Sequence, residues 1–446
     1  MLFKNYDEII NNGIDIDTKN LRKDVLNILE SSILSVEPYN CVKKHINDNS
    51  FIFEDQKINI EDFNDVYIVG FGKASIGMTQ AICDNISVKR GVIITNEEKN
   101  KVINENIETI LGGHPIPNEN SIKGAEKIID MLKNTKKDDL IIVLISGGGS
   151  ALFCNPYVEL KDLQVTTDLL LKSGANINEI NTIRKHLSKV KGGRLVSYTK
   201  SRIISLIISD IIGDPISFIA SGPTYPDDTS FFDSKKILEK YDIYEQVPKD
   251  VKKILNDGIN KKIEETPKSG DNIFCNVDNF IVANNNIACK FAEKKAKKLG
   301  YNTMVLTTRL SGEAKNTGRF LIEKSKNFEK NNEKYVFISG GETTVTIKGN
   351  GLGGRNQEMI LSIIEDISDE NIVFASIGTD GIDGKSNAAG AIADKNSYYR
   401  SKERNLDYKY FLENNDSNSF FRELGDVFLT GPTGTNVMDI QIIIIY

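Results

Sequence analysis

The sequence predicts an α/β protein with more than one domain. Short aliphatic runs alternate with longer stretches of helical periodicity along most of the chain, which is the pattern of βαβ units and of mostly parallel sheets. Several of these runs end in glycine-rich turns, where α/β proteins commonly bind ligands. A length of 446 residues also exceeds what a single hydrophobic core normally holds.

The elements can be placed in order along the chain. A helix is predicted from about residue 20, where Leu21, Val25 and Leu29 recur at helical spacing after the capping candidates Asp17 and Thr18. Another helix is predicted over residues 121–132. Strands are predicted at residues 65–70, 91–95, 107–111, 140–145, 203–209, 280–283, 303–306, 335–339, 372–377, 427–430 and 440–445.

A loop rich in proline and aspartate, residues 223–229, interrupts this alternation. We therefore expect one domain over residues 1–240 and a second over residues 241–446, with the helices of residues 1–45 free to pack on either. A lysine-rich stretch at residues 290–298 has apolar residues at helical spacing and is interpreted as a solvated helix face.

The bulk composition excludes several classes of protein. A net charge of −6 provides no broad basic field for nucleic acid, and no aliphatic run is long enough to span a membrane. The five cysteines are scattered and form no CxxC pair, which is typical of a reducing compartment. The expected protein is cytoplasmic, and the sequence leaves its oligomeric state open, with a homodimer among the options.

The most informative stretch is the predicted strand at residues 140–145 and the run Ser146, Gly147, Gly148, Gly149, Ser150 that follows it. Six consecutive aliphatic residues indicate a strand buried on both faces. Three glycines at its carboxyl end expose bare N–H groups, which favours a cradle for phosphate or carboxylate. A tight turn without a ligand is the alternative. The run Ser339, Gly340, Gly341 repeats the motif in the second half, and two such strand ends suggest a cleft between domains.

Familiar nucleotide motifs are absent or incomplete. No Walker A loop is present, and no serine lies in a Gly-x-Ser-x-Gly elbow. The segment from Gly70 to Ser75 approaches the dinucleotide fingerprint, but Ser75 replaces its last glycine and Lys73 occupies the turn. A lysine at this point suits a phosphate that is transferred better than a pyrophosphate that is only held.

Charged residues follow several predicted strands and suit phosphoryl transfer, which needs cations on phosphates, carboxylates for magnesium and a base. Each acidic residue, Asp383 above all, could instead cap a helix or turn. His114 and His186 are candidate bases, although structural hydrogen bonds are the alternative, and Cys154 is interpreted as a packing residue. The charged candidates are Asp210, Glu342, Arg355, Asp380 and Asp383.

Taken together, these strings resemble the class II glycerate 2-kinase family, the group with a C-terminal MOFRL domain. The resemblance runs in one order from about residue 20 to the carboxyl end. It is carried by residues 69–74, 113–117, 145–152, 181–188, 191–195, 209–215, 220–224, 340–345, 353–358, 378–384 and 430–437.

The resemblance implies ATP-dependent phosphorylation of (R)-glycerate at its 2-hydroxyl, with Mg²⁺. It also implies two α/β/α domains around a cleft, the first Rossmann-like with a mostly parallel sheet and the second with a mixed sheet. The expected catalytic residues are Lys73, Asp210 and Arg355, and the expected magnesium ligands are Glu342, Asp380 and Asp383. The residues expected to bind substrate or phosphate are Ser146, Gly147, Gly148, Gly149, Ser150, Gly340, Gly341 and Asn356.

Two positions depart from the family pattern. Asn387 stands where an aspartate is usual, so an acidic group is missing there, and Asn418 stands where a tyrosine is common. The rival hypothesis is an NAD(P)H-dependent hydroxypyruvate reductase, which the incomplete fingerprint at Gly70 motivates.

Overall fold

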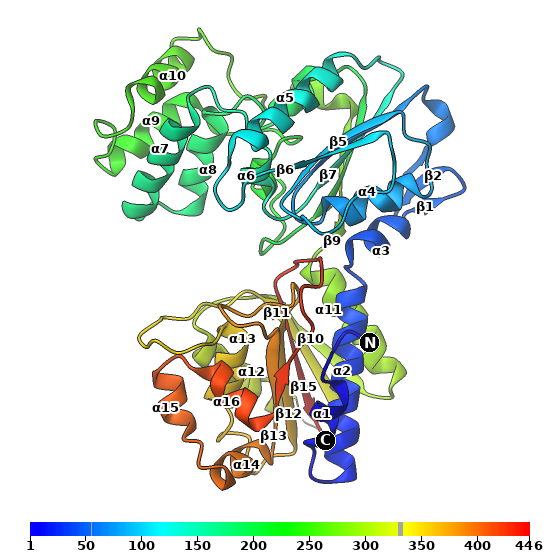
Figure 1. The fold of residues 1–446 in the computed structure, drawn as a ribbon, viewed down its shortest axis with the longest axis vertical. Helices are drawn as coiled ribbons and strands as arrows, with labels where there is room; N and C mark the ends of the chain where they lie inside the picture. The colour runs from blue at the N-terminus through cyan, green and yellow to red at the C-terminus, as the bar shows by residue number, and fades with distance from the viewer. Residues whose placement is uncertain (55, 329–332) are drawn as a thin grey trace. The chain divides into compact units, whose positions relative to one another are not determined.

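The computed structural model describes residues 1–54, 56–328 and 333–446. By contacts the chain divides into two compact units (Figure 1). The central unit contains residues 38–209 and 214–282, and the terminal unit contains residues 1–37, 210–213 and 283–446. Among the described residues, no helix is both long and apolar enough to cross a lipid bilayer.

The central unit is built on a six-stranded sheet of order β6-β5-β4-β7-β8-β9. The first five strands of that order pair in parallel, which confirms the mostly parallel sheet expected from the sequence. From β4 the chain adds β5 and β6 on one side, and it then crosses back to add β7 on the other side of β4. Since both crossovers are right-handed, α4 and α5 lie on opposite faces of the sheet. The strands are β4 Val66–Phe71, β5 Arg90–Thr95, β6 Ile107–Leu111, β7 Leu140–Ile145, β8 Arg202–Ile208 and β9 Val277–Ala283.

Helices and a small hairpin complete the central unit. The α-helices are α3 Pro38–Lys43, α4 Ser75–Cys83, α5 Glu119–Lys133, α6 Gly149–Leu152, α7 Leu160–Lys172, α8 Ile177–His186, α9 Phe231–Lys240 and α10 Lys249–Ile259. Four of them, α7 to α10, share one hydrophobic cluster that includes Leu170, Ile183, Phe231 and Leu255. This packing keeps α10 in the central unit, and β9 belongs to the central sheet, so the contact-based division falls after Val282 instead of at the expected boundary after residue 240.

The remaining short elements of the central unit are strands β1 Ile46–Asn47, β2 Ser50–Phe53 and β3 Gln56–Asn59, and the 3₁₀ turns η1 Ile60–Asp62, η2 Arg194–Tyr198, η3 Ile219–Ser221 and η4 Asn272–Asn276. The three strands pair antiparallel in a sheet of their own. These strands were not predicted from the sequence, because two to four residues are too short to show a period.

The terminal unit has a mixed sheet of order β10-β11-β15-β12-β13-β14, as expected for the second domain. β15, the last strand of the chain, lies in the middle and runs antiparallel to both β11 and β12. The strands are β10 Asn302–Leu310, β11 Tyr335–Gly341, β12 Ile372–Gly378, β13 Gly390–Asp394, β14 Val427–Phe428 and β15 Asp439–Ile445. β13 was not predicted, because its alanines carry little strand propensity.

Helices cover both faces of this sheet (Figure 1). α2 and α11 pack on one face, and α12, α13 and α16 form a hydrophobic layer on the other. Small residues such as Ala288 and Ala292 are buried on α11, whereas most of its lysines are exposed, as expected. The helices are α1 Tyr6–Asn11, α2 Ile16–Leu34, α11 Asn285–Lys298, α12 Ala314–Lys326, α13 Arg355–Ser362, α14 Ser397–Glu403, α15 Tyr408–Glu413 and α16 Ser417–Leu424.

The helices of the first 45 residues are shared between the units. α1 and α2 belong to the terminal unit, whereas α3 belongs to the central unit. The cap of α2 differs from the expected one: Asp15 is the N-cap, and Thr18 is the third helical residue that completes a capping box. Asp17 lies one residue inside the helix, where it can favour the helix dipole but cannot cap the first amides.

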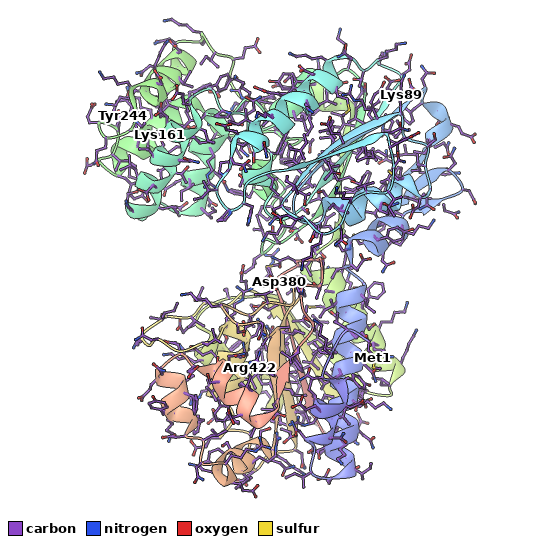
Figure 2. The ribbon with its side chains drawn as sticks, viewed as in Figure 1. Met1, Lys89, Lys161, Tyr244, Asp380 and Arg422 are labelled. Atoms are coloured by element: carbon purple, nitrogen blue, oxygen red, sulfur yellow. The ribbon has the colours of Figure 1, made fainter. Side chains whose placement is uncertain are left out.

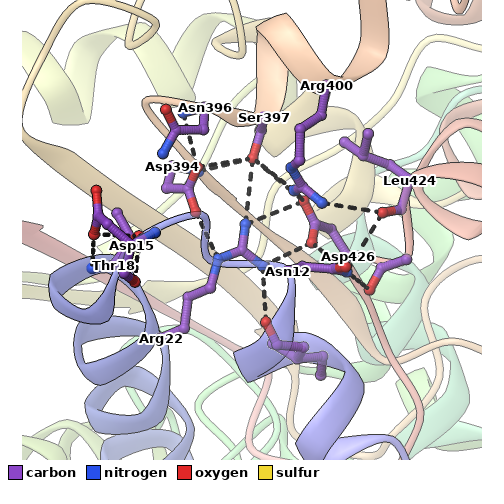
Figure 3. Close-up of polar contacts among 12 residues, drawn as sticks. Asn12, Asp15, Thr18, Arg22, Asp394, Asn396, Ser397, Arg400, Leu424 and Asp426 are labelled. Carbon is purple, nitrogen blue, oxygen red and sulfur yellow. Dashed lines mark hydrogen bonds and ion pairs between the residues drawn. The ribbon is translucent and has the colours of Figure 1, made fainter. Parts of the chain in front are cut away.

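A buried charge network fastens α2 to the terminal unit (Figure 3). Arg22 is fully buried, and its Nε donates to Asp394 Oδ2 at 2.6 Å while its Nη1 donates to Asp426 Oδ1 at 2.7 Å. Arg400 also pairs with Asp426. Burial alone would raise the pKa of Asp426, but the charges of Arg22 and Arg400 hold it below the usual range. The stabilisation from Asp426 is therefore present above about pH 4 and lost as the pH falls through the lowered pKa.

Replacing Arg22 by methionine tests this network. The variant leaves Asp394 and Asp426 buried with fewer donors, so we expect the free energy of unfolding to fall by about 3–5 kcal/mol in urea titrations. The matched control is Arg319→Met, which removes an exposed ion pair with Asp366 and should cost no more than about 1 kcal/mol. Equal small losses in both variants would contradict a structural role for Arg22.

Candidate functional site

In the central unit the glycine run at the end of β7 is bonded to the turn between β4 and α4. The amide of Lys73 donates to Gly147 O at 2.9 Å, and the amide of Ala74 donates to Ser146 Oγ at 3.1 Å. Gly72 has a φ of +126°, and a Cβ at this position would collide with Ser146. The two turns therefore form one rigid element, which presents Lys73 beside the glycine run.

His114 completes this cluster. A Cβ on Gly148, whose φ is +80°, would lie 2.8 Å from the His114 ring and 3.5 Å from Lys73 Cγ, so all three residues meet at one point. Burial, together with the nearby charge of Lys73, lowers the pKa of His114 and keeps its imidazole neutral near pH 7. The Lys73 side chain is exposed, and it has no ion-pair or hydrogen-bond partner within the described part of the chain.

The backbone amides of the two turns differ in what they can bind. Those of Gly72, Lys73, Ala74 and Ser75 all donate within the protein. In the run at residues 146–150, the amides of Gly147, Gly148 and Ser150 have no acceptor among the residues that the structure describes. The end of β7 can therefore receive an anion, whereas the turn after β4 has few amides left to hold a pyrophosphate.

In the terminal unit a second cluster lies at the carboxyl ends of β11 and β12. Both strands flank β15, and its first residue, Asp439, stands opposite Gly341 on one side and Gly378 on the other. Arg355, the first residue of α13, donates to Asp439 from Nε at 2.6 Å and from Nη2 at 2.9 Å. This bidentate pair fixes the plane of the guanidinium at the carboxyl ends of β11 and β12.

Glu342 is the third partner of Arg355, with 2.7 Å between its Oε1 and Nη1. Arg355 is about one-third exposed, whereas Asp439 is fully buried. Burial raises the pKa of Asp439 to about 6, even though the hydrogen bonds and charge of Arg355 act in the opposite direction. Asp439 was not predicted from the sequence, where its only signal is an acidic residue directly before an aliphatic run.

Asp383 and Asn356 both hold the start of α13. Asp383 accepts from the backbone and side-chain amides of Asn356 and Gln357, at 2.8–3.2 Å. Asn356 also donates to Asp439 and accepts from Ser376. The alternative considered from the sequence was a local cap; Asp383 instead caps the start of α13, which is distant in sequence. Its role as a magnesium ligand stays a prediction, and metal binding would have to compete with four hydrogen bonds.

Gly340 and Gly341 lie inside β11 and pair with β15. A Cβ on Gly340 would collide with Asn285, and one on Gly341 would collide with the backbone of Leu310. Close packing therefore accounts for both glycines, and their predicted contact with phosphate remains untested.

The remaining acidic candidates lie at strand ends. Glu342 follows β11 and is exposed. Asp380 (labelled in Figure 2) follows β12 in a turn where its Oδ1 accepts from the amide of Ile382 at 3.0 Å. Asp210 follows β8 but belongs by contacts to the terminal unit. Within the described ranges, no three His, Cys, Asp or Glu side chains gather as a preformed metal site.

The other histidine and the cysteine have structural surroundings. His186 is fully buried; its Nδ1 lies 2.8 Å from Thr182 O and its Nε2 2.9 Å from Glu265 Oε1, which favours the structural alternative to a catalytic base. Burial raises the pKa of the Cys154 thiol despite the nearby charges of Lys191 and Arg184, in agreement with a packing role.

The two positions that depart from the family pattern meet at one arginine. Arg422 donates from Nε to Asn418 Oδ1 at 3.0 Å and from Nη2 to Asn387 Oδ1. Asn418 in turn donates to Gln357 Oε1 at 2.8 Å. Asn387 therefore accepts from a cation, and Asn418 supports the start of α13 directly through Gln357.

Two known families match successive parts of the chain. The domain of unknown function DUF4147 matches residues 24–256, and the MOFRL family matches residues 335–439. The glycerate 2-kinase of Pyrococcus horikoshii is 42% identical over 437 residues, which are 95% of this chain and 97% of that protein. A putative hydroxypyruvate reductase of Agrobacterium vitis is 37% identical over 391 residues, covering 85% of this chain and 86% of that protein.

A crystal structure of glycerate kinase from Thermotoga maritima superposes with a TM-score of 0.87 at 36% identity, and it covers 96% of this chain and 100% of the other. Both family matches occur in the expected order, and the identity extends over nearly the whole chain. The chain therefore belongs to the glycerate kinase family that carries a C-terminal MOFRL domain.

Proposed function

We propose that this chain is an ATP-dependent kinase that phosphorylates the 2-hydroxyl of (R)-glycerate to give 2-phosphoglycerate and ADP. The observation that carries the proposal is the Arg355–Asp439 pair, which holds a guanidinium in a fixed orientation among carboxylates at the ends of β11 and β12. Phosphoryl transfer is catalysed mainly by positioning and by such fixed charges. The names of the relatives from Pyrococcus horikoshii and Thermotoga maritima support the same activity.

The residues of the two units have different tasks in this proposal. Lys73 and the amides of Gly147, Gly148 and Ser150 bind phosphate oxygens, and Arg355 neutralises charge on the transferring phosphoryl group. Asp210 accepts the proton of the glycerate 2-hydroxyl as its oxygen bonds to the γ-phosphorus and the bond to ADP breaks. The proposal assigns both clusters to one pair of substrates.

Magnesium is implied by the kinase activity, and the residues present are chemically suited to it. Mg²⁺ prefers oxygen ligands and usually takes one or two carboxylates, several waters and the substrate phosphates, so it does not need a preformed cage. Glu342 and Asp380, which lie at the ends of β11 and β12, provide hard carboxylate oxygens of this kind. When bound, the ion would neutralise charge on the phosphate oxygens.

The alternative activity, reduction of hydroxypyruvate with NAD(P)H, rests on the name of the Agrobacterium vitis relative and on the incomplete fingerprint at Gly70. The engaged amides of the turn after β4 argue against it, because dinucleotide sites use that turn to hold the pyrophosphate. Incubation with (R)-glycerate, ATP and Mg²⁺ should yield 2-phosphoglycerate. NAD(P)H oxidation with hydroxypyruvate, without that product, would overturn the proposal.

Arg355→Ala tests the guanidinium. By analogy with arginine fingers, we expect kcat to fall by about 10³-fold, measured as ADP released at saturating glycerate and ATP. Arg355→Lys should also be strongly impaired, because an ammonium cannot reproduce the bidentate pair with Asp439. Arg319→Ala, which removes an exposed arginine of the same unit, is the control and should retain activity. Near-complete activity of Arg355→Ala would contradict this assignment.

Asp439→Asn tests how Arg355 is positioned. Because the pKa of Asp439 is about 6, the carboxyl takes up a proton as the pH falls through 6 and its ionic hold on the guanidinium is lost. We expect kcat of the unmodified enzyme to fall below this pH. The asparagine variant should have a kcat roughly ten- to a hundredfold lower at pH 7.5, from the loss of charge-assisted bonds, and should lack the acid limb near pH 6. Retention of that limb would contradict the prediction.

A further inference from the structure

The central unit contains a cavity of about 580 Å³ beside the glycine run. Its wall is mainly apolar and is formed by the loop after β6 and by α7. The apolar residues are Pro115, Ile116, Pro117, Leu163, Val165 and Leu171. Ser150 and Ala151, at the start of α6, border the same cavity. The volume lies in the range of pockets that enclose a drug-sized molecule, roughly 300–1,000 Å³.

An unpaired cation faces this apolar wall. Arg184, on α8, lines the cavity and is partly buried, and burial lowers its pKa. No hydrogen bond or ion pair to its guanidinium is found among the described residues. A guanidinium removed from water without an anionic partner is costly, which indicates that an anion from outside the protein completes the site.

A second cation lies at the same end of the cavity. Lys191 is buried, and its Nζ donates to Ser150 O at 2.5 Å and to Phe153 O at 3.0 Å, without a carboxylate partner. The acidic residue of the lining, Asp168, is exposed and pairs with Lys172. The polar end near Ser150 is therefore positive, and the opposite wall is apolar.

We infer that this cavity binds the adenine nucleotide of the kinase reaction, with the base against the wall formed by Pro115, Leu163 and Leu171 and the phosphates directed towards Ser150 and Arg184. The inference rests on the proposed function, from which the two candidate ligands follow. Glycerate is a small polar acid that has no apolar surface to bury and would leave most of the cavity unfilled. A nucleotide has both a flat apolar base and a multiply charged chain.

The absence of tryptophan from the chain provides a direct test of binding. Leu171→Trp places a single fluorophore on the cavity wall. The control, Ile177→Trp, places one in the same unit but outside the cavity lining. The two positions are matched in exposure, at 62% for Leu171 and 61% for Ile177. ADP should change the emission of the first variant with a saturable dependence on concentration and leave the second unchanged. No response of Leu171→Trp to ADP, or saturation by glycerate alone, would overturn the inference.

Arg184→Met tests the role of the cation in turnover. The KM for ATP should rise about ten- to a hundredfold, as expected for the loss of a charged contact, while the KM for glycerate stays within about twofold. The matched control is Lys161→Met, which removes an exposed charge from α7 outside the cavity and should leave both constants unchanged. A rise in the KM for glycerate alone, or no change in either constant, would overturn the assignment.

The two experiments separate this inference from the proposed function. The fluorescence titration with ADP does not require turnover, whereas 2-phosphoglycerate formation does not depend on where the base lies. If ADP binds at Leu171→Trp but no 2-phosphoglycerate forms, the cavity remains a nucleotide site and the glycerate kinase proposal fails. If product forms and Leu171→Trp does not respond to ADP, the kinase proposal stands and the cavity assignment fails.

Discussion

The terminal-unit site depends on one buried carboxylate. Asp439 begins the central strand of a mixed sheet and lies between the ends of β11 and β12. The site residues at those strand ends are therefore arranged around it. Its two hydrogen bonds fix Arg355, and a third bond connects it to Asn356. Burial of a charge at this depth is tolerated only because these donors surround it. The position of Arg355 therefore follows from the sheet topology.

In the proposed function, the two units hold phosphate in complementary ways. The central unit offers backbone amides at the end of β7 together with the exposed ammonium of Lys73, and such a cradle suits any phosphate without demanding one orientation. The terminal unit offers a planar guanidinium held in one direction. A kinase needs both, because one phosphoryl group must move while the remaining phosphates of the nucleotide stay in place.

Glycines in this chain have two distinct uses. In the β4–α4 turn and the run after β7, they allow two backbones and the His114 ring to approach closely, which leaves amides uncovered for a ligand. In β11 they make room for Asn285 and the backbone of Leu310 inside a paired strand. The same Ser-Gly-Gly string therefore forms a turn after a strand in one unit and the paired end of a strand in the other. The string alone does not distinguish these uses, because the difference lies in what packs against it.

Local sequence was sufficient for the strands of the two large sheets other than β13, for the helices α2, α5 and α11, and for the residues that follow strand ends, because periodicity and glycine content are properties of neighbouring residues. It also placed Lys73 beside a glycine turn and Arg355 at a helix start. Tertiary structure decided the rest. Asp439 pairs with a residue 84 positions away, and Asp383 is engaged by amides 26 and 27 positions away. Arg184 is recognised as a candidate anion-binding residue only in the folded structure, where its guanidinium lines a cavity and has no partner among the described residues. Burial and pairing between distant segments depend on the whole fold, so only the fold could reveal these roles.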